Sequence, residues 1–537
     1  MALKKENKIG AELNLDFLRD KKFEFIAELK KEFPEAEIYL VGGAVRDLLV
    51  KRKIKDFDFL VRKIPAKDLE KFLAKFGTVN LVGEHFGVFK FTPHGETSAN
   101  LFEIALPRRE FAMGTGGYRD FEVQSNPDLK VEEDLSRRDF TVNAMALDIT
   151  NSKKYQITDP FGGVEDLKEK TIRAVREPAE RFKEDYSRML RAIRFACQLD
   201  FQIEEKTWAT IKNKIKGIDE ISHEVGLKEE GPIAEQEVVE KRVVPYEVIA
   251  REFLKSFIAN PVKALDLYDE SGAFKELMPE ILKMKNCPQP ENFHSEGDVW
   301  AHTRLALEKL SSSEFIAEFS AKGGSASGGQ KQFNDQKLSG ELVMAVLFHD
   351  LGKPYTIKTP EKDKTDRIRF NEHDTVGGKM ARKIAEHLKL SSPEDVGIDV
   401  EKMAWLVEHH MLLVQGDIAQ MRPSTIEKYF FNPRYPGDDL LKLSFVDISA
   451  TIPQIGQSDF SDFEAMLKRI EELKQLSATK KELPAPILDG HEIMQEFKLK
   501  SGPEIGQLLS LLREEQLNKK IKTKEEAITL LRKYLKQ

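Results

Sequence analysis

The sequence has few cysteines and no long apolar run. Only two cysteines occur among 537 residues, Cys197 and Cys287, and they lie far apart. This spacing argues against a disulfide framework and against a cysteine zinc site, so we expect a cytoplasmic protein. No stretch approaches the ~18 apolar residues of a membrane-spanning helix, and we expect no membrane partner. The opening residues, MALKKENKIGAELNLDF, contain no apolar segment typical of a signal peptide.

The chain also lacks an excess of positive charge. Its formal net charge is -7, which argues against a uniformly basic surface that would coat a nucleic acid. A local basic groove remains compatible with this value, because contacts to phosphates act locally. Hydrophobic residues make up 40% of the chain and charged residues 33%, as in ordinary soluble proteins. At ~150 residues per domain, the length predicts three or four domains.

The order of predicted elements divides the chain into an α+β front part and a helical remainder. Strand-like and helix-like segments alternate over 37–160, and the expected strands are EIYLVGG, KDFDFLV, FGVFKFT, LFEIAL and MALDI. Later segments carry apolar residues at helical spacing. The boundaries that we expect are 1–36 for a helical extension, 37–163 for the α+β head, 164–290 for an all-α neck and body, 291–460 for a second all-α domain, and 461–537 for a helical tail.

Two segments interrupt the helical part. Residues 224–245 are acidic and without apolar periodicity, and we expect an irregular surface insertion there. Residues 321–336, AKGGSASGGQKQFNDQ, have the composition of a flexible loop.

A pair of aspartates one residue apart is the first candidate site. Side chains two apart on a strand point to one face, so Asp56 and Asp58 can present two carboxylates side by side. Such hard oxygen ligands suit Mg²⁺, and two ions ~3.5–4 Å apart can assist an in-line displacement at phosphate. Glu103, in LFEIAL, is a candidate third carboxylate on a neighbouring strand. The alternative is a surface turn followed by an edge strand with two solvated aspartates.

A Gly-Gly pair precedes these aspartates and predicts a phosphate-binding turn. Gly42 and Gly43 have no side chains, so the backbone can approach a ligand closely. The helix that we expect from about Ala44 offers free N–H groups to an anion. Arg46 lies on its first turn and can add a guanidinium fork for phosphate.

The segment RRDFTVNA supplies a second group of polar side chains. Arg137 and Arg138 can clamp a triphosphate, and Asn143 can bond a sugar or phosphate oxygen. The alternative is a basic turn that precedes a buried strand.

The segment EDYSRMLRAIR supplies a third group. Arg188, Arg191 and Arg194 recur every three residues, so they lie along one side of a helix. Asp185 precedes Arg188 by three residues and can pair with it. A fixed Asp–Arg pair presents acceptors and donors together, as reading a base edge requires. A solvated, salt-bridged helix face is the alternative.

Taken in order, these motifs resemble a known family. GGAVRDLL, DFD, RRDFTVNA, DPFGGVEDL and EDYSRMLRAIRFA together resemble the class II tRNA nucleotidyltransferases. These are the CCA-adding enzymes and the related bacterial poly(A) polymerases, within the polymerase-beta superfamily. The resemblance covers roughly 37–200 and implies a polymerase-beta-like head with a mixed sheet.

The resemblance also implies roles for these residues. Asp56 and Asp58 would bind the catalytic Mg²⁺ ions, and the tRNA 3′ hydroxyl would attack the α-phosphate of CTP or ATP and release pyrophosphate. Gly43 and Arg46 would contact the incoming nucleotide, together with an arginine of the 137–138 pair. The amino-acid template that selects CTP and then ATP would consist of Asp185, Arg188 and Arg191.

One segment departs from the family pattern. The family usually carries ERI-x-x-EF-x-K-x-L after the base-reading helix. PYEVIAREFLKSF, at 245–257, keeps Glu247, Glu252, Phe253 and Lys255 but has Val248 in place of the arginine. We therefore expect a locally rebuilt neck.

Histidines and aspartates form a second constellation in the later half. The motifs are NFHSEGDVWAH, LFHDLGK, FNEHD, HHM and VD, and imidazole with carboxylate suits transition metals such as Mn²⁺, Fe²⁺ or Ni²⁺. Their order resembles an HD phosphohydrolase domain. The resemblance implies His302, His349, Asp350 and Asp447 as the minimal ligand set, and His373 and His410 as the extra histidines of a more fully metal-binding subfamily. His294 and Glu296 are second-shell groups or ordinary caps. The alternative is a helical domain that keeps the scaffold without hydrolysis.

The tail resembles the C-terminal segment of HD-containing bacterial CCA-adding enzymes. Its lysines would meet tRNA phosphates or form a solvated face; they are Lys498, Lys500, Lys519, Lys520 and Lys522. We expect full CCA addition, because the Gly-rich segment 107–123 is suited to the flexible element that helps the switch from C to A. The alternatives are an A-adding, CC-adding or poly(A) enzyme of this fold, or a metal phosphohydrolase whose front half binds RNA.

Overall fold

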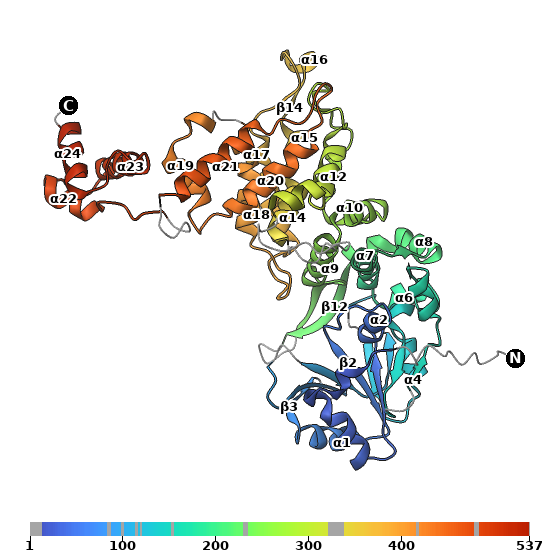
Figure 1. Cartoon of the computed structure of the whole chain (residues 1–537). Coiled ribbons are helices and arrows are strands. Elements are labelled where there is room, and N and C mark those ends of the chain that lie inside the picture. Colours follow the sequence, from blue (N-terminus) through green and yellow to red (C-terminus); the bar gives the residue numbers. More distant parts are fainter. Residues whose placement is uncertain are drawn as a thin grey trace. The chain divides into compact units, whose positions relative to one another are not determined.

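The computed structural model of the chain forms two compact units, Met1–Leu277 and Met278–Gln537, which are described separately (Figure 1). The structure describes residues 13–82, 87–97, 101–112, 116–118, 121–151, 155–228, 235–319, 338–414, 418–476 and 483–535. The predicted loop 321–336 lies outside these residues.

A seven-stranded mixed sheet forms the head in unit 1. Its strand order is β3-β4-β5-β2-β1-β8-β9, and the pairing of β2 with β5 is parallel, whereas the other pairs are antiparallel. The strands are β1 (Glu37–Val41), β2 (Phe57–Arg62), β3 (Gly77–Val82), β4 (Val88–Pro93), β5 (Phe102–Ala105), β8 (Ala146–Asp148) and β9 (Gln156–Thr158). The five strands predicted from the sequence correspond to β1, β2, β4, β5 and β8.

Phenylalanines form the core on one face of this sheet. Phe23 stacks on Phe102 with ring centroids 5.1 Å apart, and Phe57 and Phe59 of β2 each lie 5.7 Å from the Phe102 ring. The helix α1 (Glu24–Glu32) adds Phe25 to the same cluster. Side chains alternate along a strand, so packing of Phe57 and Phe59 on this face directs Asp58 to the other face.

The opposite face packs against the helix α4 (Val131–Ser136). Leu60, on the same face of β2 as Asp58, joins Val131 and Leu135 of α4 in a buried cluster. Arg137 and Arg138 follow α4 directly, and the short helix α2 (Gly43–Leu49) follows β1. The sheet and α4 therefore bring the Gly-Gly turn, the aspartates and the arginine pair to one region of the head.

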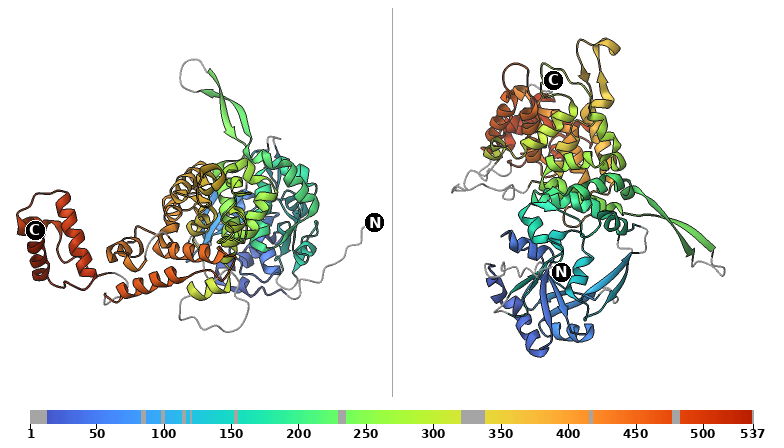
Figure 2. Two further views of the ribbon diagram at one scale, coloured as in Figure 1. Left: turned by 90° about the horizontal axis from the view of Figure 1, so that it is seen from above. Right: turned by 90° about the vertical axis from the view of Figure 1, so that its right-hand side faces the viewer.

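Two predictions for unit 1 were wrong. The segment 107–123, expected to be a Gly-rich loop, contains β6 (Arg108–Ala112) and the start of β7 (Phe121–Ser125), which pair antiparallel; part of its Gly-rich middle lies outside the described residues. The acidic insertion contains a second pair, β12 (Ile221–Lys228) and β13 (Glu235–Arg242), which projects as a long hairpin (Figure 2). A two-stranded ribbon satisfies its backbone by cross-strand hydrogen bonds and needs no buried face, so missing apolar periodicity did not exclude strands.

Helices complete unit 1 after the sheet. The helix α7 (Ser187–Leu199) packs against α9 (Tyr246–Ala259), which runs unbroken through the segment where a rebuilt neck was expected, and Val248 is buried within it. The helices are α3 (Ala66–Leu73), α5 (Gly163–Lys168), α6 (Pro178–Glu184), α7 (Ser187–Leu199), α8 (Glu205–Lys214), α9 (Tyr246–Ala259), α10 (Pro261–Glu270) and α11 (Ala273–Leu277). A short parallel pair, β10 (Thr171–Ile172) and β11 (Gln202–Ile203), lies between them.

The described residues of unit 2 form helices and one short pair of strands, β14 (Ile357–Lys358) and β15 (Arg369–Phe370). Every residue of 342–348 in the central helix α14 is buried. The helices are α12 (Val299–Lys309), α13 (Ser313–Phe319), α14 (Gly340–Phe348), α15 (Lys353–Thr356), α16 (Pro360–Asp363), α17 (His373–His387), α18 (Val400–His409), α19 (Pro423–Phe430), α20 (Gly437–Ala450), α21 (Ser461–Lys474), α22 (Gly490–Phe497), α23 (Pro503–Leu517) and α24 (Lys524–Tyr534). No helix within the described residues is both long and apolar enough to cross a membrane.

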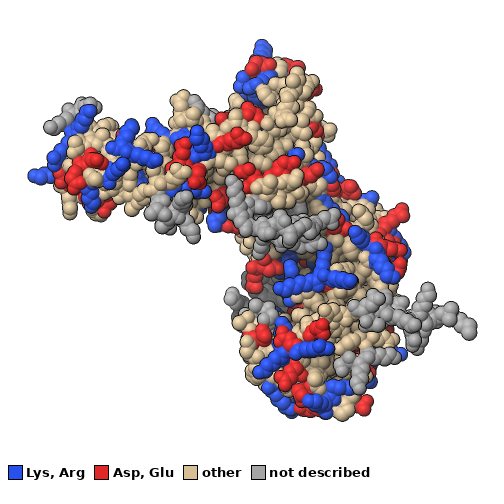
Figure 3. All heavy atoms as spheres, in the orientation of Figure 1, with Lys and Arg blue, Asp and Glu red and all other residues tan. Residues whose placement is uncertain are grey.

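The tail has a small apolar core of its own, formed by α22, α23 and α24. The five lysines singled out in the sequence are all exposed, and Lys520 pairs with Glu515 at 3.0 Å. Figure 3 shows lysine and arginine side chains mixed with acidic ones over this segment. The surface therefore offers cations to a ligand without forming a patch of one sign.

Candidate functional site

The two aspartates and Glu103 meet at the parallel junction of β2 and β5. The register places Asp58 directly opposite Glu103, and Asp56 lies immediately before β2. Burial raises the pKa of Asp58 to about 6; Arg138 opposes this shift, and the charges of Glu103 and Asp56 add to it. The three carboxylates therefore form a site with uncompensated negative charge, which a bound cation would relieve.

The Gly-Gly turn lies against this group. Gly42 has φ +70, and a Cβ built on it would lie 2.5 Å from Nη1 of Arg138 and 3.6 Å from Oδ2 of Asp58. A side chain at 42 would therefore displace Arg138 from the carboxylates. Arg46 donates to Oδ1 of Asn143 at 2.8 Å, so the side-chain oxygen of Asn143 positions an arginine.

A residue that the sequence analysis missed, Asp134, holds both arginines of the pair. Its side chain is completely buried; Oδ1 accepts from Nε of Arg137 at 2.9 Å, and Oδ2 lies 3.6 Å from Nη2 of Arg138. Burial alone would raise the pKa of Asp134, but the two guanidinium groups hold it below its ordinary value. Asp134 lies three residues before Arg137 and four before Arg138, and it orients both side chains. This spacing is visible in the sequence.

The Asp185–Arg188 pair predicted from the sequence is not formed. Asp185 has extended backbone before α7, and its Oδ1 accepts from the backbone N–H of Ser187 at 2.8 Å. Arg188 instead donates to Glu184 at 2.6 Å, because a spacing of four residues places Glu184 beside it. Both Asp185 and Arg188 are buried polar residues near the head.

The other two arginines of α7 also have partners. Arg191 donates to Oδ2 of Asp139 at 2.5 Å; burial would raise the pKa of Asp139, but Arg191 outweighs it and the pKa is about 2. Arg194 is bound by Glu252 of α9 and donates to Gln198 at 2.8 Å. Asp139 lies within RRDFTVNA and was not singled out, although it joins this motif to α7 by an ion pair.

Phe195 brings the head and the neck arginines together. The guanidinium carbon of Arg46 lies 5.4 Å from the ring centroid, that of Arg191 5.6 Å and that of Arg194 3.9 Å. Cations over an aromatic face are stabilised by the ring quadrupole. The ring therefore helps to hold residues from α2 and α7 in one site.

The histidines and aspartates predicted for the later half converge in unit 2. The six candidate ligands come from five helices or their ends: His302 from α12, His349 and Asp350 after α14, His373 from α17, His410 after α18, and Asp447 from α20. Among the described residues, three sets of three potential ligands have their ligand atoms within 4.8 Å of one another. They are His294, Glu296 and His302; His302, His349 and Asp350; and Asp350, His373 and His410. The carboxylates of the head are not among these sets.

Asp350 lies between two groups of ligands. Its Oδ2 is 3.3 Å from Nε2 of His349 and 3.8 Å from Nε2 of His302, while its Oδ1 is 3.5 Å from Nε2 of His373 and 3.9 Å from Nε2 of His410. Asp447 completes the first group, with Oδ1 3.0 Å from Nε2 of His302. The two oxygens of one carboxylate can thus serve two cations.

The Nδ1 atoms of these histidines are all occupied. Those of His349, His373 and His410 lie 2.8, 2.8 and 2.7 Å from backbone carbonyl oxygens, and that of His302 is 2.8 Å from Glu296. A carbonyl acceptor fixes the proton on Nδ1 and leaves Nε2 free for a metal ion. Glu296 therefore holds the ring of His302 through Nδ1 and is not an ordinary cap.

Lys353 was missed, although it lies in the quoted motif LFHDLGK. It is a buried lysine whose Nζ forms an ion pair with Oδ2 of Asp350 at 2.7 Å and donates to Oε1 of Gln289 at 2.7 Å. Nε2 of His349 is buried and has no hydrogen-bond partner within the described residues. Buried polar atoms of this kind, together with the nitrogen and oxygen donor set, fit a transition metal.

Metal binding at pH 7 is expected to release about one proton, and His302 is its source. Burial lowers the pKa of His302, but hydrogen bonds to Asp447 and Glu296 outweigh it and raise the pKa to about 9. His410 has a pKa lowered to about 4 by burial and by its histidine neighbours, so it contributes none. Titration calorimetry with Mn²⁺ in buffers of different ionisation enthalpy measures the release.

The same shift predicts how stability depends on pH without metal. The pKa of His302 is higher in the folded protein than its ordinary value of 6.5, so protonation of this ring stabilises the fold. The stabilisation is complete below pH 6.5 and is lost as the pH rises through about 9. Replacement of His302 by glutamine should abolish both the proton release and this pH dependence. Metal binding without proton release would contradict the assignment.

Two segments match known domain families. Residues 38–173 match the Poly A polymerase head domain, and residues 317–448 match the HD domain. His302 lies outside the second match, and the template candidates on α7 lie outside the first.

Relatives of known name cover most of the chain. The Multifunctional CCA protein of Actinobacillus pleuropneumoniae is 33% identical over 399 residues, which are 73% of this chain and 79% of that protein. The Multifunctional CCA protein of Neisseria meningitidis is 33% identical over 355 residues, or 66% and 68% of the two chains.

Solved structures share the fold. The CCA-adding enzyme of Bacillus stearothermophilus in complex with CTP has a TM-score of 0.57 and 20% identity, with 96% of each chain covered. The CCA-adding enzyme of Thermotoga maritima complexed with tRNA has a TM-score of 0.55 and 18% identity, with 98% of this chain and 97% of that chain covered. By its relatives, its head and its HD domain, the chain belongs to the family of bacterial multifunctional CCA proteins, class II CCA-adding enzymes with a C-terminal HD domain.

Proposed function

We propose that unit 1 adds C, C and then A to the 3′ end of tRNA from CTP and ATP, with release of pyrophosphate. The observation that carries this proposal is the parallel register of β2 and β5, which sets Asp58 beside Glu103 and leaves the negative charge of the site uncompensated. The relatives named Multifunctional CCA protein support the reaction assigned to this site.

Asp56 and Asp58 are the proposed Mg²⁺ ligands, with Glu103 as a third carboxylate. Bound Mg²⁺ would supply activation of the attacking hydroxyl and charge stabilisation at the leaving phosphate. Gly42 lets Arg138 approach the carboxylates, and Gly43 begins α2. Arg46 and Arg138 are proposed to hold the triphosphate of the nucleotide, and Asn143 positions Arg46.

Selection of the base is proposed for the beginning of α7. Asp185 presents a carboxylate near Arg188 and Arg191, and burial raises its pKa. Arg191 stays paired with Asp139, which belongs to the motif beside the nucleotide. Arg194 is proposed to act by holding α7 against α9 through Glu252, so its contribution to nucleotide binding is indirect.

Unit 2 is proposed to be a metal-dependent phosphohydrolase. The ligands would be His302, His349 and Asp447 for one ion, His373 and His410 for a second, and Asp350 between them. Mn²⁺, Fe²⁺ and Ni²⁺ suit this donor set, and the ions would supply Lewis acidity and an activated water for phosphate-ester hydrolysis. Lys353 fixes Asp350, and Glu296 fixes His302.

The tail is proposed to contact tRNA through its exposed lysines, as a nonspecific phosphate-binding surface.

A tRNA transcript that lacks its 3′ CCA tests the function of unit 1. Purified protein with Mg²⁺ is given CTP, ATP or both, and the 3′ ends are sequenced. Addition of C, C and A followed by arrest is expected. Addition of A alone would assign an A-adding or poly(A) enzyme, and no addition to any RNA would overturn the transferase proposal.

A further inference from the structure

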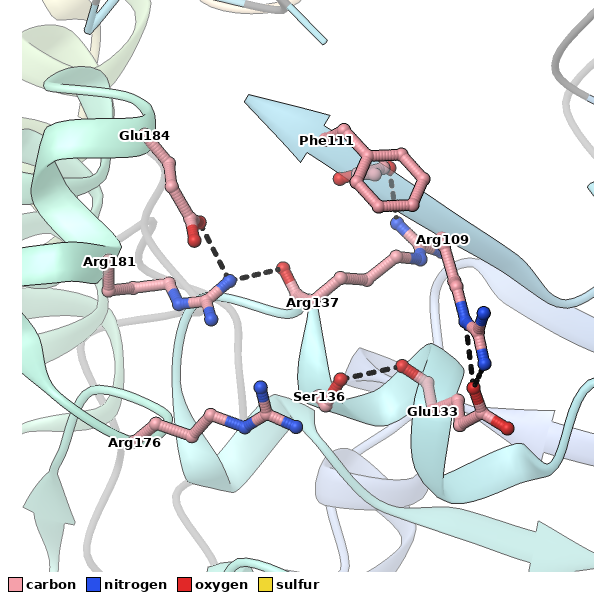
Figure 4. A pocket seen from close by; sticks show the side chains of 9 residues that line it. Arg109, Phe111, Glu133, Ser136, Arg137, Arg176, Arg181 and Glu184 are labelled. Carbon is pink, nitrogen blue, oxygen red and sulfur yellow. Dashed lines mark hydrogen bonds and ion pairs between the residues drawn. The ribbon is translucent and has the colours of Figure 1, made fainter. Parts of the chain in front are cut away.

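A cavity of about 280 Å³ lies in unit 1 between the strand β6, the end of α4 and the helix α6 (Figure 4). We call it the arginine pocket, because its lining includes Arg109, Arg137, Arg176 and Arg181. Apart from Arg137, none of the residues that the sequence predicted to bind a nucleotide lines it.

The three carboxylates that line the pocket are already paired with arginines, and one of them, Glu110, is shared by Arg108 and Arg137. Glu184 lies 2.8 Å from Arg181 and 2.6 Å from Arg188, so one negative charge serves two cations. Glu133 is bound by Arg109. The positive charge of the arginines that line the pocket therefore exceeds the negative charge of its carboxylates, and the excess is available to an anionic ligand.

Two of its arginines have unused binding capacity. The side chain of Arg181 is only 8% exposed, and no described residue accepts a hydrogen bond from its buried Nε. Arg176 is exposed, and within the described part of the chain it makes no ion pair. Both guanidinium groups extend into the same space in Figure 4. A phosphate between them would accept hydrogen bonds from both forks.

An aromatic ring lies on the other side of the pocket. Phe111 of β6 is 46% exposed, which is unusual for a large apolar side chain, and Figure 4 shows its ring at the rim. Exposed rings beside basic groups are typical of surfaces that stack the bases of single-stranded nucleic acids. The pocket thus combines a phosphate clamp with a stacking surface and has room for one nucleotide.

The pocket adjoins the carboxylate site through Asp134. This buried residue holds Arg137, which lines the pocket, and Arg138, which lies against Gly42 and Asp58. A ligand in the pocket would therefore lie next to the arginine pair that borders the carboxylates. Because Gly43 and Arg46 are proposed to hold the incoming nucleotide, the pocket is left for the strand that carries the attacking hydroxyl.

We propose that the arginine pocket binds the RNA 3′ strand next to its reacting end, with one phosphate between Arg176 and Arg181 and one base on Phe111. The inference rests on the proposed function of unit 1, since it gives that site its place for the RNA substrate. It is distinct from contacts of the tail with tRNA.

The test compares Arg176→Gln and Phe111→Ala with Arg19→Gln, a matched control at a solvent-exposed arginine paired with Asp16. Arg176 and Phe111 are exposed, so both variants should fold. Steady-state kinetics give KM for tRNA lacking CCA and KM for CTP. Equilibrium binding of the same tRNA at several salt concentrations gives Kd and its salt dependence.

Arg176→Gln is expected to raise Kd and KM for tRNA about tenfold, to leave KM for CTP unchanged, and to make the salt slope shallower by about 0.7. Phe111→Ala is expected to raise Kd for tRNA about tenfold without a change of slope, and Phe111→Trp to retain binding. Arg19→Gln should match the unaltered protein.

Three outcomes would overturn the inference. A raised KM for CTP with unchanged tRNA binding would assign the pocket to the free nucleotide. Unchanged constants throughout would remove it from substrate binding, and so would an equal effect of Arg19→Gln. If the unaltered protein adds no nucleotide, the proposed function fails, while a shift of Kd in the pocket variants still tests RNA binding by itself.

Discussion

Asp58→Ala is expected to reduce nucleotide addition by roughly a thousandfold or more, while hydrolysis by unit 2 stays within about twofold. Asp58 is the carboxylate that the sheet register sets beside Glu103, and its loss removes a proposed Mg²⁺ ligand. The measurement is single-turnover addition of CMP to a tRNA lacking CCA, alongside hydrolysis of bis(p-nitrophenyl) phosphate with Mn²⁺ by the same preparation.

The variant should remain folded, and the sign of the pKa shift explains why. The folded-state pKa of Asp58 is raised to about 6, so ionisation of this carboxyl at pH 7.5 opposes folding. Its removal should leave the melting temperature unchanged or raise it. Asp68→Ala, at an exposed aspartate of α3, is the matched control and should keep full addition. Addition by Asp58→Ala at the rate of this control would contradict the assigned site.

Asp350→Asn is expected to remove both the bound transition metal and phosphohydrolase activity, with a loss of hydrolysis of about a hundredfold or more. Asp350 faces four histidines and both proposed ion positions. In the variant, each ion would therefore lose one of its proposed ligands. Metal content after Mn²⁺ loading and dialysis, measured by mass spectrometry, is the direct readout. CCA addition should be unaffected.

A second variant separates metal loss from loss of folding. Asparagine can still accept a hydrogen bond from Lys353, but a buried ion pair is broken, and this costs about 3–5 kcal/mol. His373→Gln leaves that pair intact and should remove about one of two ions. His387→Gln, at an exposed histidine that ends α17, is the control and should retain both metal and hydrolysis. Full metal content in Asp350→Asn would refute the ligand set.

Local sequence patterns predicted the elements that carry the head site, because those elements follow from short-range chemistry. The apolar residues on either side of the two aspartates predicted a strand. Because these apolar residues pack among phenylalanines on one face of the sheet, Asp58 lies on the other face. The pairing of Asp58 with Glu103 could only be suggested, since a parallel register depends on segments about 45 residues apart. The roles of single residues at this site remain predictions.

Partner choice among charged side chains was the least predictable feature. Arg188 has carboxylates three and four residues upstream, and sequence spacing alone permits either partner. The capping of Ser187 by Asp185 decides in favour of Glu184, and that depends on where α7 begins. The hairpin β12–β13 was missed for a related reason, because cross-strand pairing leaves no periodic signal in a charged segment.

The sharing of Asp134 by two arginines has a consequence for how this enzyme could be altered. A substitution there frees Arg137 and Arg138 together, so a single change would disturb two ligand contacts that are otherwise separate. A change at Arg138 that alters binding of the triphosphate would therefore show epistasis with changes at Arg137. Variants with altered triphosphate binding that are selected by laboratory evolution should mostly retain Asp134.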